Sequence, residues 1–139
     1  MLHEILFRGK CKNDNKWLYG FPYVTRKYAV KINWYCSEFG RMRIDEIIPE
    51  TVGQFTGLTD KNGKRIFEGD ICRFRRFNDI YIGEIDFNVK TASFIMWYQP
   101  IVESYGKKAT QKKLLSVRDN IEVIGNIHDN PELLENSSL

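Results

Sequence analysis

The fold class is decided by the stretch Lys27–Cys36, which reads KYAVKINWYC. One series of alternate residues in it is apolar throughout: Tyr28, Val30, Ile32, Trp34 and Cys36. The other series is more polar: Lys27, Ala29, Lys31, Asn33 and Tyr35. Successive side chains of a β-strand point to opposite faces, so a period of two predicts a strand with one apolar face against a core.

Two further strands are predicted before this stretch, at Leu2–Arg8 and Lys16–Val24. The polar run Lys12–Asn15 between them favours a turn, because Asn and Asp side chains hydrogen-bond their own backbone. These elements predict a hairpin. After the stretch, Asp45–Gly57 fits a short strand, a single helical turn, or both in sequence around Pro49.

The second half of the chain is typical of an antiparallel meander. Thr59–Lys64 contains Asn62-Gly63, whose residues tolerate positive φ, and a tight turn is expected at Glu68–Asp70. Strands are then predicted at Ile71–Phe77, Ile80–Phe87, Thr91–Tyr98 and about Ile121–Ile127. The polar segment Gly106–Lys113 is expected to form a mobile loop. Pro131 is expected to start a short helical turn at Asp129–Leu134.

These elements together predict a mainly β fold. It consists of an N-terminal antiparallel sheet, a C-terminal strongly bent meander or SH3-like small barrel, and a short C-terminal helical turn. Gly83 and Gly125 favour the barrel, because glycines permit sharp strand bending. Residues 1–139 are expected to form a single domain, with a subdivision near residues 41–50 as the alternative.

Composition narrows the class of protein. The 139 residues are 42% hydrophobic and carry a net charge of only +3, which suits a folded domain and not a protein that coats nucleic acid. Cys11, Cys36 and Cys72 are widely spaced and form no Cys-x-x-Cys pair, so no zinc site is expected. Without a signal-peptide run or a membrane-spanning stretch, we expect a cytoplasmic protein with reduced thiols and no membrane partner.

Catalytic motifs fail at specific positions. A phosphate loop at Gly57 lacks the Ser or Thr that holds magnesium, because Arg65 follows Lys64. A calcium loop starting at Asp60 fails because Arg65 takes the place of its glycine and Ile71 that of its bidentate Glu. We therefore expect no enzyme, no cofactor and no metal site.

Two catalytic alternatives stay open beside that expectation. A metal-dependent hydrolase would use four carboxylates, Glu68, Asp70, Glu84 and Asp86, and their simpler interpretation is a turn and a solvated strand face. Cys–His catalysis would need His3 or His128 near one of the cysteines, and nothing in the order of the residues indicates it. Cys36 and Cys72 fall on apolar strand faces, where core packing is the simpler role.

Basic and aromatic residues interleave in Cys72–Phe77, CRFRRF. Cations bind phosphates and exposed rings stack on bases, so nucleic-acid binding is one hypothesis. Its residues are Arg73, Arg75, Arg76, Lys107, Lys108, Lys112 and Lys113, with Arg41 and Arg43 in support. A solvated strand face over a core predicts the same alternation, since Arg73 and Arg75 point one way and Phe74 the other.

Protein binding is the other hypothesis. Three Trp and seven Tyr exceed what a small core comfortably hides, and exposed aromatic residues favour protein contacts. Exposed edge strands would add pairing between subunits. Either a homo-oligomer or a complex with another protein follows from this pattern.

Three segments carry a family pattern. They are Gln54–Ile71, which reads QFTGLTDKNGKRIFEGDI; Phe7–Lys10 leading to Lys16–Gly20; and Val123–Ile127 running into Asn130–Leu134. Together they resemble the YopX family. The resemblance implies a mainly β fold and an origin in phages or prophages, and it supplies no catalytic residues. The expected function is that of an accessory protein, a non-catalytic protein-interaction or self-assembling module, with a nucleic-acid-binding barrel as the alternative.

Overall fold

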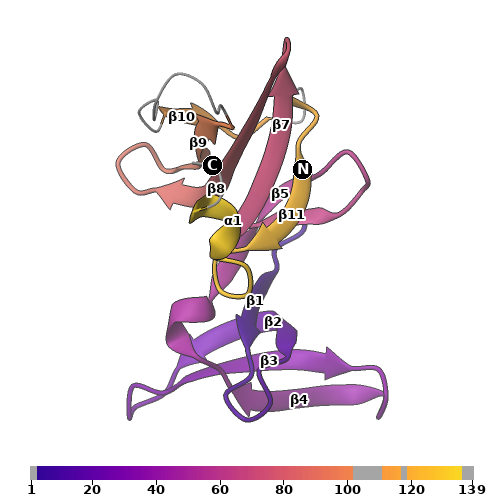
Figure 1. Ribbon diagram of the computed structural model, residues 1–139. Helices are drawn as coiled ribbons and strands as arrows, with labels where there is room; N and C mark the ends of the chain where they lie inside the picture. Colours follow the sequence, from indigo (N-terminus) through magenta and orange to yellow (C-terminus); the bar gives the residue numbers. More distant parts are fainter. Residues whose placement is uncertain (1–2, 102–110, 117–118, 136–139) are drawn as a thin grey trace. The chain divides into compact units, whose positions relative to one another are not determined.

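The computed structural model describes residues 3–101, 111–116 and 119–135 (Figure 1). The chain divides into two compact units, an N-terminal unit, Met1–Phe55, and a C-terminal unit, Thr56–Leu139. The first contains β1 (Phe7–Lys10), β2 (Trp17–Val24), β3 (Val30–Cys36), β4 (Arg41–Glu46), the 3-10 helix η1 (Pro49–Thr51) and the start of β5 (Gly53–Thr59). The second contains β6 (Arg65–Phe67), β7 (Asp70–Arg76), β8 (Asp79–Asn88), β9 (Ser93–Pro100), β10 (Gln111–Leu114), β11 (Glu122–Asn126) and α1 (Glu132–Glu135). The mainly β prediction is confirmed.

The N-terminal unit is an antiparallel sheet in the order β4-β3-β2-β1-β5. The predicted hairpin is confirmed, with Phe7 opposite Gly20 and Lys10 opposite Trp17, although β1 is shorter than the predicted strand. Asp14 Oδ1 accepts the Lys16 N–H at 3.0 Å in the connecting turn. Polar turn residues therefore do fix this hairpin.

The predicted apolar face of β3 does cover a core, with one exception. Ile32 is fully buried in a cluster with Cys11, Leu18 and Ile47, and Val30 and Trp34 pack against it. Tyr28 was predicted on the same face, and that was wrong: it is 87% exposed. Its N–H bonds to the Thr25 carbonyl in a turn, so the strand begins only at Val30.

The segment Asp45–Gly57 fitted a short strand, a helical turn or both, and the structure has both in sequence. η1 starts at Pro49 and β5 follows from Gly53. β5 pairs with β1 at its start, where Phe7 stands opposite Gln54, and β6 lies beside it in the strand order. Residues Arg41–Glu46 form β4, and the boundary between the two units follows Phe55.

The C-terminal unit has a five-stranded sheet in the order β10-β9-β8-β7-β11. The meander β7-β8-β9 is confirmed, and β11 returns to pair with β7, with a bulge between Val123 and Gly125. Its core consists of side chains from one face of this sheet, with Ile66 of β6 and Ile121 packed among them; the sheet residues are Cys72, Phe74, Ile85, Met96, Tyr98 and Val123. β10 and β11 are the two ends of this strand order, so an SH3-like closure is not confirmed.

The end of the chain departs from the prediction in one respect. Residues 111–113 of the expected loop belong to β10, which pairs with β9, and residues 106–110 lie outside the described part. An edge strand obtains its backbone hydrogen bonds from one neighbour, and polar side chains give it no alternating signal. The helical turn is present as α1 after Pro131. Among the described residues, no helix is long and apolar enough to cross a membrane.

Candidate functional site

The basic residues of β7 lie on both faces of its sheet. Arg73 and Arg75 are exposed on one face, and Phe74, which is only 3% exposed, lies on the other. Arg76 shares the face of Phe74 by alternation, and its guanidinium lies 5.7 Å from the centre of that ring. The three arginines of the predicted nucleic-acid site therefore do not form one patch.

The lysines of the predicted site are divided in the same way. Lys112 stands opposite Trp97 and Lys113 opposite Met96, so the two lysines point to different faces. Lys112 shares the face of Arg73, because Trp97 stands opposite Glu84 and Glu84 opposite Ile71. The remaining two predicted residues, Lys107 and Lys108, lie outside the described residues.

That shared face also carries acidic side chains. Glu84 lies in the row between Lys112 and β7, and Asp86 is next on the same side of β8. Burial raises the pKa of Glu84, and the neighbouring Asp86 charge raises it further. The face alternates in charge and offers no continuous basic surface to a phosphate backbone.

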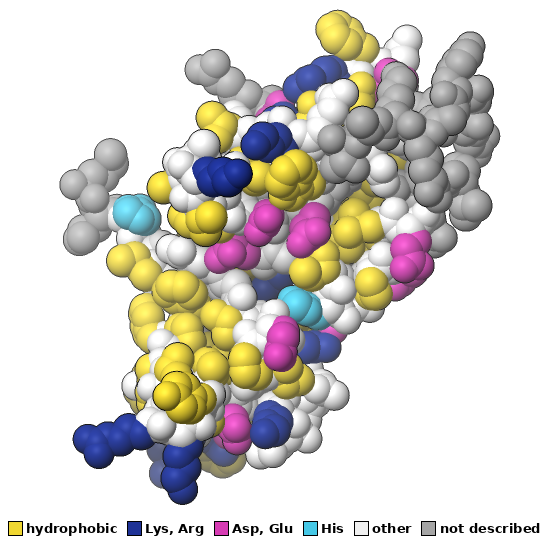
Figure 2. All heavy atoms as spheres, turned by 90° about the vertical axis from the view of Figure 1, so that its left-hand side faces the viewer, with side chains coloured by type: hydrophobic (Ala, Val, Ile, Leu, Met, Phe, Trp, Pro, Cys, Tyr) yellow, Lys and Arg dark blue, Asp and Glu magenta, His cyan; other side chains and the backbone are white. Residues whose placement is uncertain are grey.

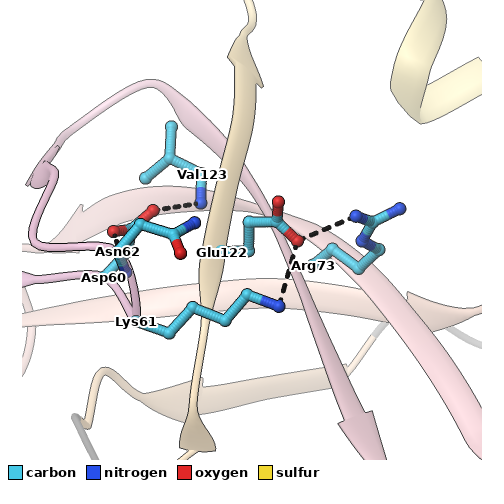
Figure 3. A network of polar contacts seen from close by, with 6 residues as sticks. All are labelled: Asp60, Lys61, Asn62, Arg73, Glu122 and Val123. Atoms are coloured by element: carbon cyan, nitrogen blue, oxygen red, sulfur yellow. Dashed lines mark hydrogen bonds and ion pairs between the residues drawn. The ribbon is translucent and has the colours of Figure 1, made fainter.

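Arg73 is also neutralised by direct contacts (Figure 3). Its Nη2 donates to Glu122 Oε2 at 2.8 Å, and Lys61 Nζ lies 3.4 Å from the same oxygen. Hydrogen bonds from Arg73 and Lys61 hold the pKa of Glu122 below its usual range, although partial burial opposes them. Arg73 thus connects β7 to β11, which is a structural role.

Lys113 is held in a similar way. It forms an ion pair with Asp119, and its ammonium lies 4.5 Å from the centre of the Phe74 ring. A cation over an aromatic face is stabilised by the ring quadrupole. Lys113 therefore supports the buried Phe74 and is not a surface charge available to a ligand.

Arg75 of the predicted site and the nearby Phe77 are exposed at the tip of the β7–β8 hairpin. Arg75 lines a hollow of about 470 Å³ together with Phe74 and Ile80. Phe77, which was predicted as the end of a strand, occupies the turn instead, with a φ of 55° and 92% exposure. A bulky residue at positive φ is strained, and such strain is found at functional sites.

Two of the four carboxylates proposed for a hydrolase have structural contacts of their own. Asp70 is 1% exposed and accepts the Phe67 N–H at 2.7 Å inside the turn. Asp86 accepts the Trp97 indole N–H at 3.2 Å and the Phe87 N–H at 2.8 Å. Within the described part of the chain, no three His, Cys, Asp or Glu side chains are placed to hold a metal ion.

The cysteines are free thiols in the cores. Cys11 and Cys36 are buried in the N-terminal unit, and Cys72 is fully buried in the C-terminal one. A buried thiol among apolar side chains behaves as a small hydrophobic group. This agrees with the core role predicted for Cys36 and Cys72.

The largest functional candidate lies on the N-terminal unit, on the sheet face opposite its core. We call it the aromatic face, and it consists of Tyr19, Phe21, Tyr23, Tyr35, Met42 and Ile44. Each of these side chains is between 43% and 60% exposed. They come from β2, β3 and β4, which are neighbours in the sheet. Figure 2 shows hydrophobic side chains exposed over this unit.

Strand register makes the aromatic face continuous. Phe21 stands opposite Asn33, which stands opposite Ile44, and in the next row Tyr35 stands opposite Met42. Opposed residues of an antiparallel sheet share a face and lie within side-chain contact. The side-chain oxygen of Asn33 is buried in this row and has no hydrogen-bond partner within the described structure.

A glycine explains why these aromatics face outward. Gly20 alternates with Tyr19 and Phe21 in β2, and a Cβ on it would lie 2.1 Å from the Asn33 carbonyl oxygen. The core side of β2 thus presents small residues and Leu18, and the large rings are left on the other side. Sequence reasoning predicted surplus aromatic surface but not these residues, since both faces of WLYGFPYV are apolar.

Comparisons with known proteins agree with the fold. A family model described as YopX protein matches residues 6–135. Among solved structures, the crystal structure of protein EF1440 from Enterococcus faecalis is similar, with a TM-score of 0.50 and 24% sequence identity. That match covers 96% of this chain and 99% of the other. No curated protein matches the chain.

Proposed function

The chain belongs to the YopX protein family, and we propose that it acts as a protein-binding module through the aromatic face of its N-terminal unit. The observation that carries the proposal is a group of exposed rings and aliphatic chains on one face of three neighbouring strands. Apolar surface in water is unfavourable, and contiguous patches of this kind mark interaction sites. Tyr side chains suit such a site, because the ring is apolar and the hydroxyl can hydrogen-bond.

The proposed activity is binding and not catalysis. The aromatic face presents tyrosine, phenylalanine, methionine and isoleucine side chains, which supply area and hydroxyl groups for contact. Two of the four carboxylates considered for a hydrolase, Asp70 and Asp86, already accept backbone N–H groups. We place this module in the cytoplasm as an accessory protein of a phage or prophage, an interpretation that the family resemblance supports.

Site-specific crosslinking tests the proposal. A photoreactive phenylalanine analogue replaces Phe21 in one variant and Val89, which is 81% exposed in the C-terminal unit, in a matched control. Each variant is irradiated in cells that express it. We expect discrete crosslinked species from position 21 and not from position 89. Equal crosslinking at both positions, or none at position 21, would refute the proposal.

A second function is favoured by the tip of the β7–β8 hairpin. Arg75 and Arg76, on opposite faces of β7, directly precede Phe77, whose ring is 92% exposed and whose φ is positive. Cations bind phosphates and an exposed ring stacks on an unpaired base, so single-stranded nucleic acid is the ligand class. The SH3-like small barrel belongs with this second proposal, and the bulge between Val123 and Gly125 supports it, because a bulge bends its strand.

Fluorescence anisotropy with labelled single-stranded DNA and RNA tests the second function. Affinity should fall steeply as salt rises, and it should be lost in Arg75→Ala/Arg76→Ala and in Phe77→Ser. Lys112→Ala is the matched control, because it removes an exposed cation at a distance from the tip along the sheet order. Binding that does not depend on salt, or that Lys112→Ala weakens equally, would exclude the tip as the site.

A further inference from the structure

The strand β4 is an edge of the N-terminal sheet, and its first four residues are all exposed. An edge strand presents unpaired backbone N–H and C=O groups that can pair with another strand. We propose that β4 pairs antiparallel with β4 of a second copy of this chain, so that the two sheets and their aromatic faces become continuous. This inference goes beyond the proposed function, because pairing at the β4 edge extends the aromatic face and leaves it open to its partner.

Two hydrogen bonds at the end of β4 show which of its backbone groups point away from β3 and can pair with another strand. The Ile47 N–H bonds to the Val30 carbonyl, so Ile47 points its backbone groups toward β3. The Glu46 carbonyl instead accepts the Lys12 N–H, on the other side. Because these directions alternate along an antiparallel strand, Met42 and Ile44 point their N–H and C=O groups away from β3. No hydrogen bond of these outward groups is found within the described residues.

Side-chain faces limit the pairing to a few registers. Opposed residues in an antiparallel pair share a face, so a two-fold axis must pass through Met42, Arg43 or Ile44. An axis at Ile44 would place Met42 against the partner's Glu46, whose carbonyl is already bonded to Lys12. An axis at Met42 would set Arg41 against the partner's Arg43, which repels.

The axis at Arg43 gives complementary contacts. Met42 then stands opposite the partner's Ile44, and each such pair exchanges two backbone hydrogen bonds. These side chains belong to the aromatic face, so apolar residues meet across the axis. On the opposite face Arg41 stands against the partner's Asp45, and the same pair recurs by symmetry. One carboxylate oxygen of Asp45 accepts the Trp34 indole N–H at 2.8 Å, and no described residue donates to the other, which can make this contact.

The one contact between like charges in this register is that of Arg43 with the partner's Arg43. Its guanidinium lies 5.9 Å from the Trp34 ring centre and 5.7 Å from that of Phe39. Trp34 is on β3, which neighbours β4 on the side away from the free edge. The two guanidinium groups are therefore drawn apart by their own rings, which reduces their repulsion.

Sedimentation equilibrium of the full chain tests the inference with two variants. Met42→Pro removes an outward N–H and no bond to β3, whereas Met42→Thr changes the same side chain and keeps that N–H. We expect the wild type to be a dimer and Met42→Pro to raise its dissociation constant roughly 100-fold, because two backbone bonds are lost and their partners left unpaired. Met42→Thr should have a much smaller effect. A monomeric wild type, or equal effects of both variants, would overturn the inference.

A surface variant covers the case in which Met42→Pro does not fold, as judged by circular dichroism. Arg41→Glu places a carboxylate opposite the partner's Asp45 and should also dissociate the dimer, while Arg26→Glu, in the exposed β2–β3 turn, should not. Dimerisation unchanged by Arg41→Glu contradicts the β4 pairing. If position 21 crosslinks to another protein and the chain stays monomeric, the aromatic face binds as proposed and the β4 pairing is excluded.

Discussion

One carboxylate oxygen of Asp60, Oδ2, accepts the backbone N–H of Val123 at 2.9 Å, across 63 positions of sequence (Figure 3). The other oxygen accepts the N–H groups of Asn62 at 2.8 Å and Lys64 at 2.9 Å. Asp60 is only 8% exposed. A single buried side chain therefore closes the turn between β5 and β6 and attaches β11 to it.

Replacing this carboxylate should lower the stability of the C-terminal unit. Asp60→Ala leaves three backbone N–H groups without their acceptor, and we expect a loss of about 2–4 kcal/mol in the free energy of unfolding. Urea denaturation followed by tryptophan fluorescence measures it. The control is Asn62→Ala in the same turn, which keeps its backbone N–H and should change stability by less than about 0.5 kcal/mol. Equal stability of the two variants would contradict the role of Asp60.

The same contact predicts a dependence of stability on pH. Burial raises the pKa of Asp60, but the N–H groups of Val123, Lys64 and Asn62 together lower it below its ordinary value of 3.8. A carboxyl with a lowered folded-state pKa stabilises the fold fully above its ordinary pKa and loses that contribution as the pH falls through the lowered value. The stability difference between wild type and Asp60→Asn should therefore be largest near neutral pH and shrink in acid. A difference that stays constant in acid would show that ionisation of Asp60 contributes nothing.

Glu84 predicts a dependence of stability on pH with the opposite sign. Burial, and then the charge of Asp86, raises its pKa, so ionisation opposes folding. The folded state loses stability as the pH rises from the ordinary pKa of Glu through the raised value, and the loss is complete above it. Glu84→Gln should therefore increase the melting temperature slightly at pH 7 and not at pH 4. Glu122→Gln is the control, because the pKa of Glu122 is lowered and its variant should be destabilised at pH 7.

Alternating apolarity was sufficient to predict most strands, because each has one face against a core. It failed where hydrogen bonding and not burial decides the structure. Tyr28 continues the alternation of β3 but belongs to a turn closed by Thr25, and Gln111–Leu114 has no alternation but pairs with β9. Neither bond leaves a periodic signal in the sequence.

The sequence predicted the candidate site less completely than it predicted the fold. The basic residues were found by composition, but only register shows that Glu122 and Asp119 neutralise Arg73 and Lys113. In β2 both faces are apolar, so the pattern alone does not say which one is buried. The close approach of Gly20 to the Asn33 carbonyl decides it, and this is a contact between residues distant in sequence.

Gly83 makes the corresponding close approach in the C-terminal sheet. A Cβ on it would lie 1.9 Å from the Trp97 carbonyl oxygen, which is a backbone atom that cannot move without separating β8 from β9. We expect Gly83→Ala to cost roughly 2–4 kcal/mol of folding free energy. Gly57→Ala is a useful comparison, because nothing lies within 4 Å of its Cβ position and only its φ of +89° opposes the change. It should cost about 1 kcal/mol, and a larger loss than that of Gly83→Ala would refute the packing argument.

The strain at Phe77 predicts a gain in stability at the expense of binding. Asn tolerates positive φ better than an aromatic residue, so Phe77→Asn should raise the free energy of unfolding by about 0.5–1 kcal/mol. Val89→Asn is the matched control, since Val89 is also an exposed apolar residue in a turn but has no positive φ, and it should give no gain. If the tip binds single-stranded nucleic acid, Phe77→Asn should also lose that affinity, whereas Val89→Asn should keep it. A variant at Phe77 that is no more stable than its control would show that the turn holds no strain for function to explain.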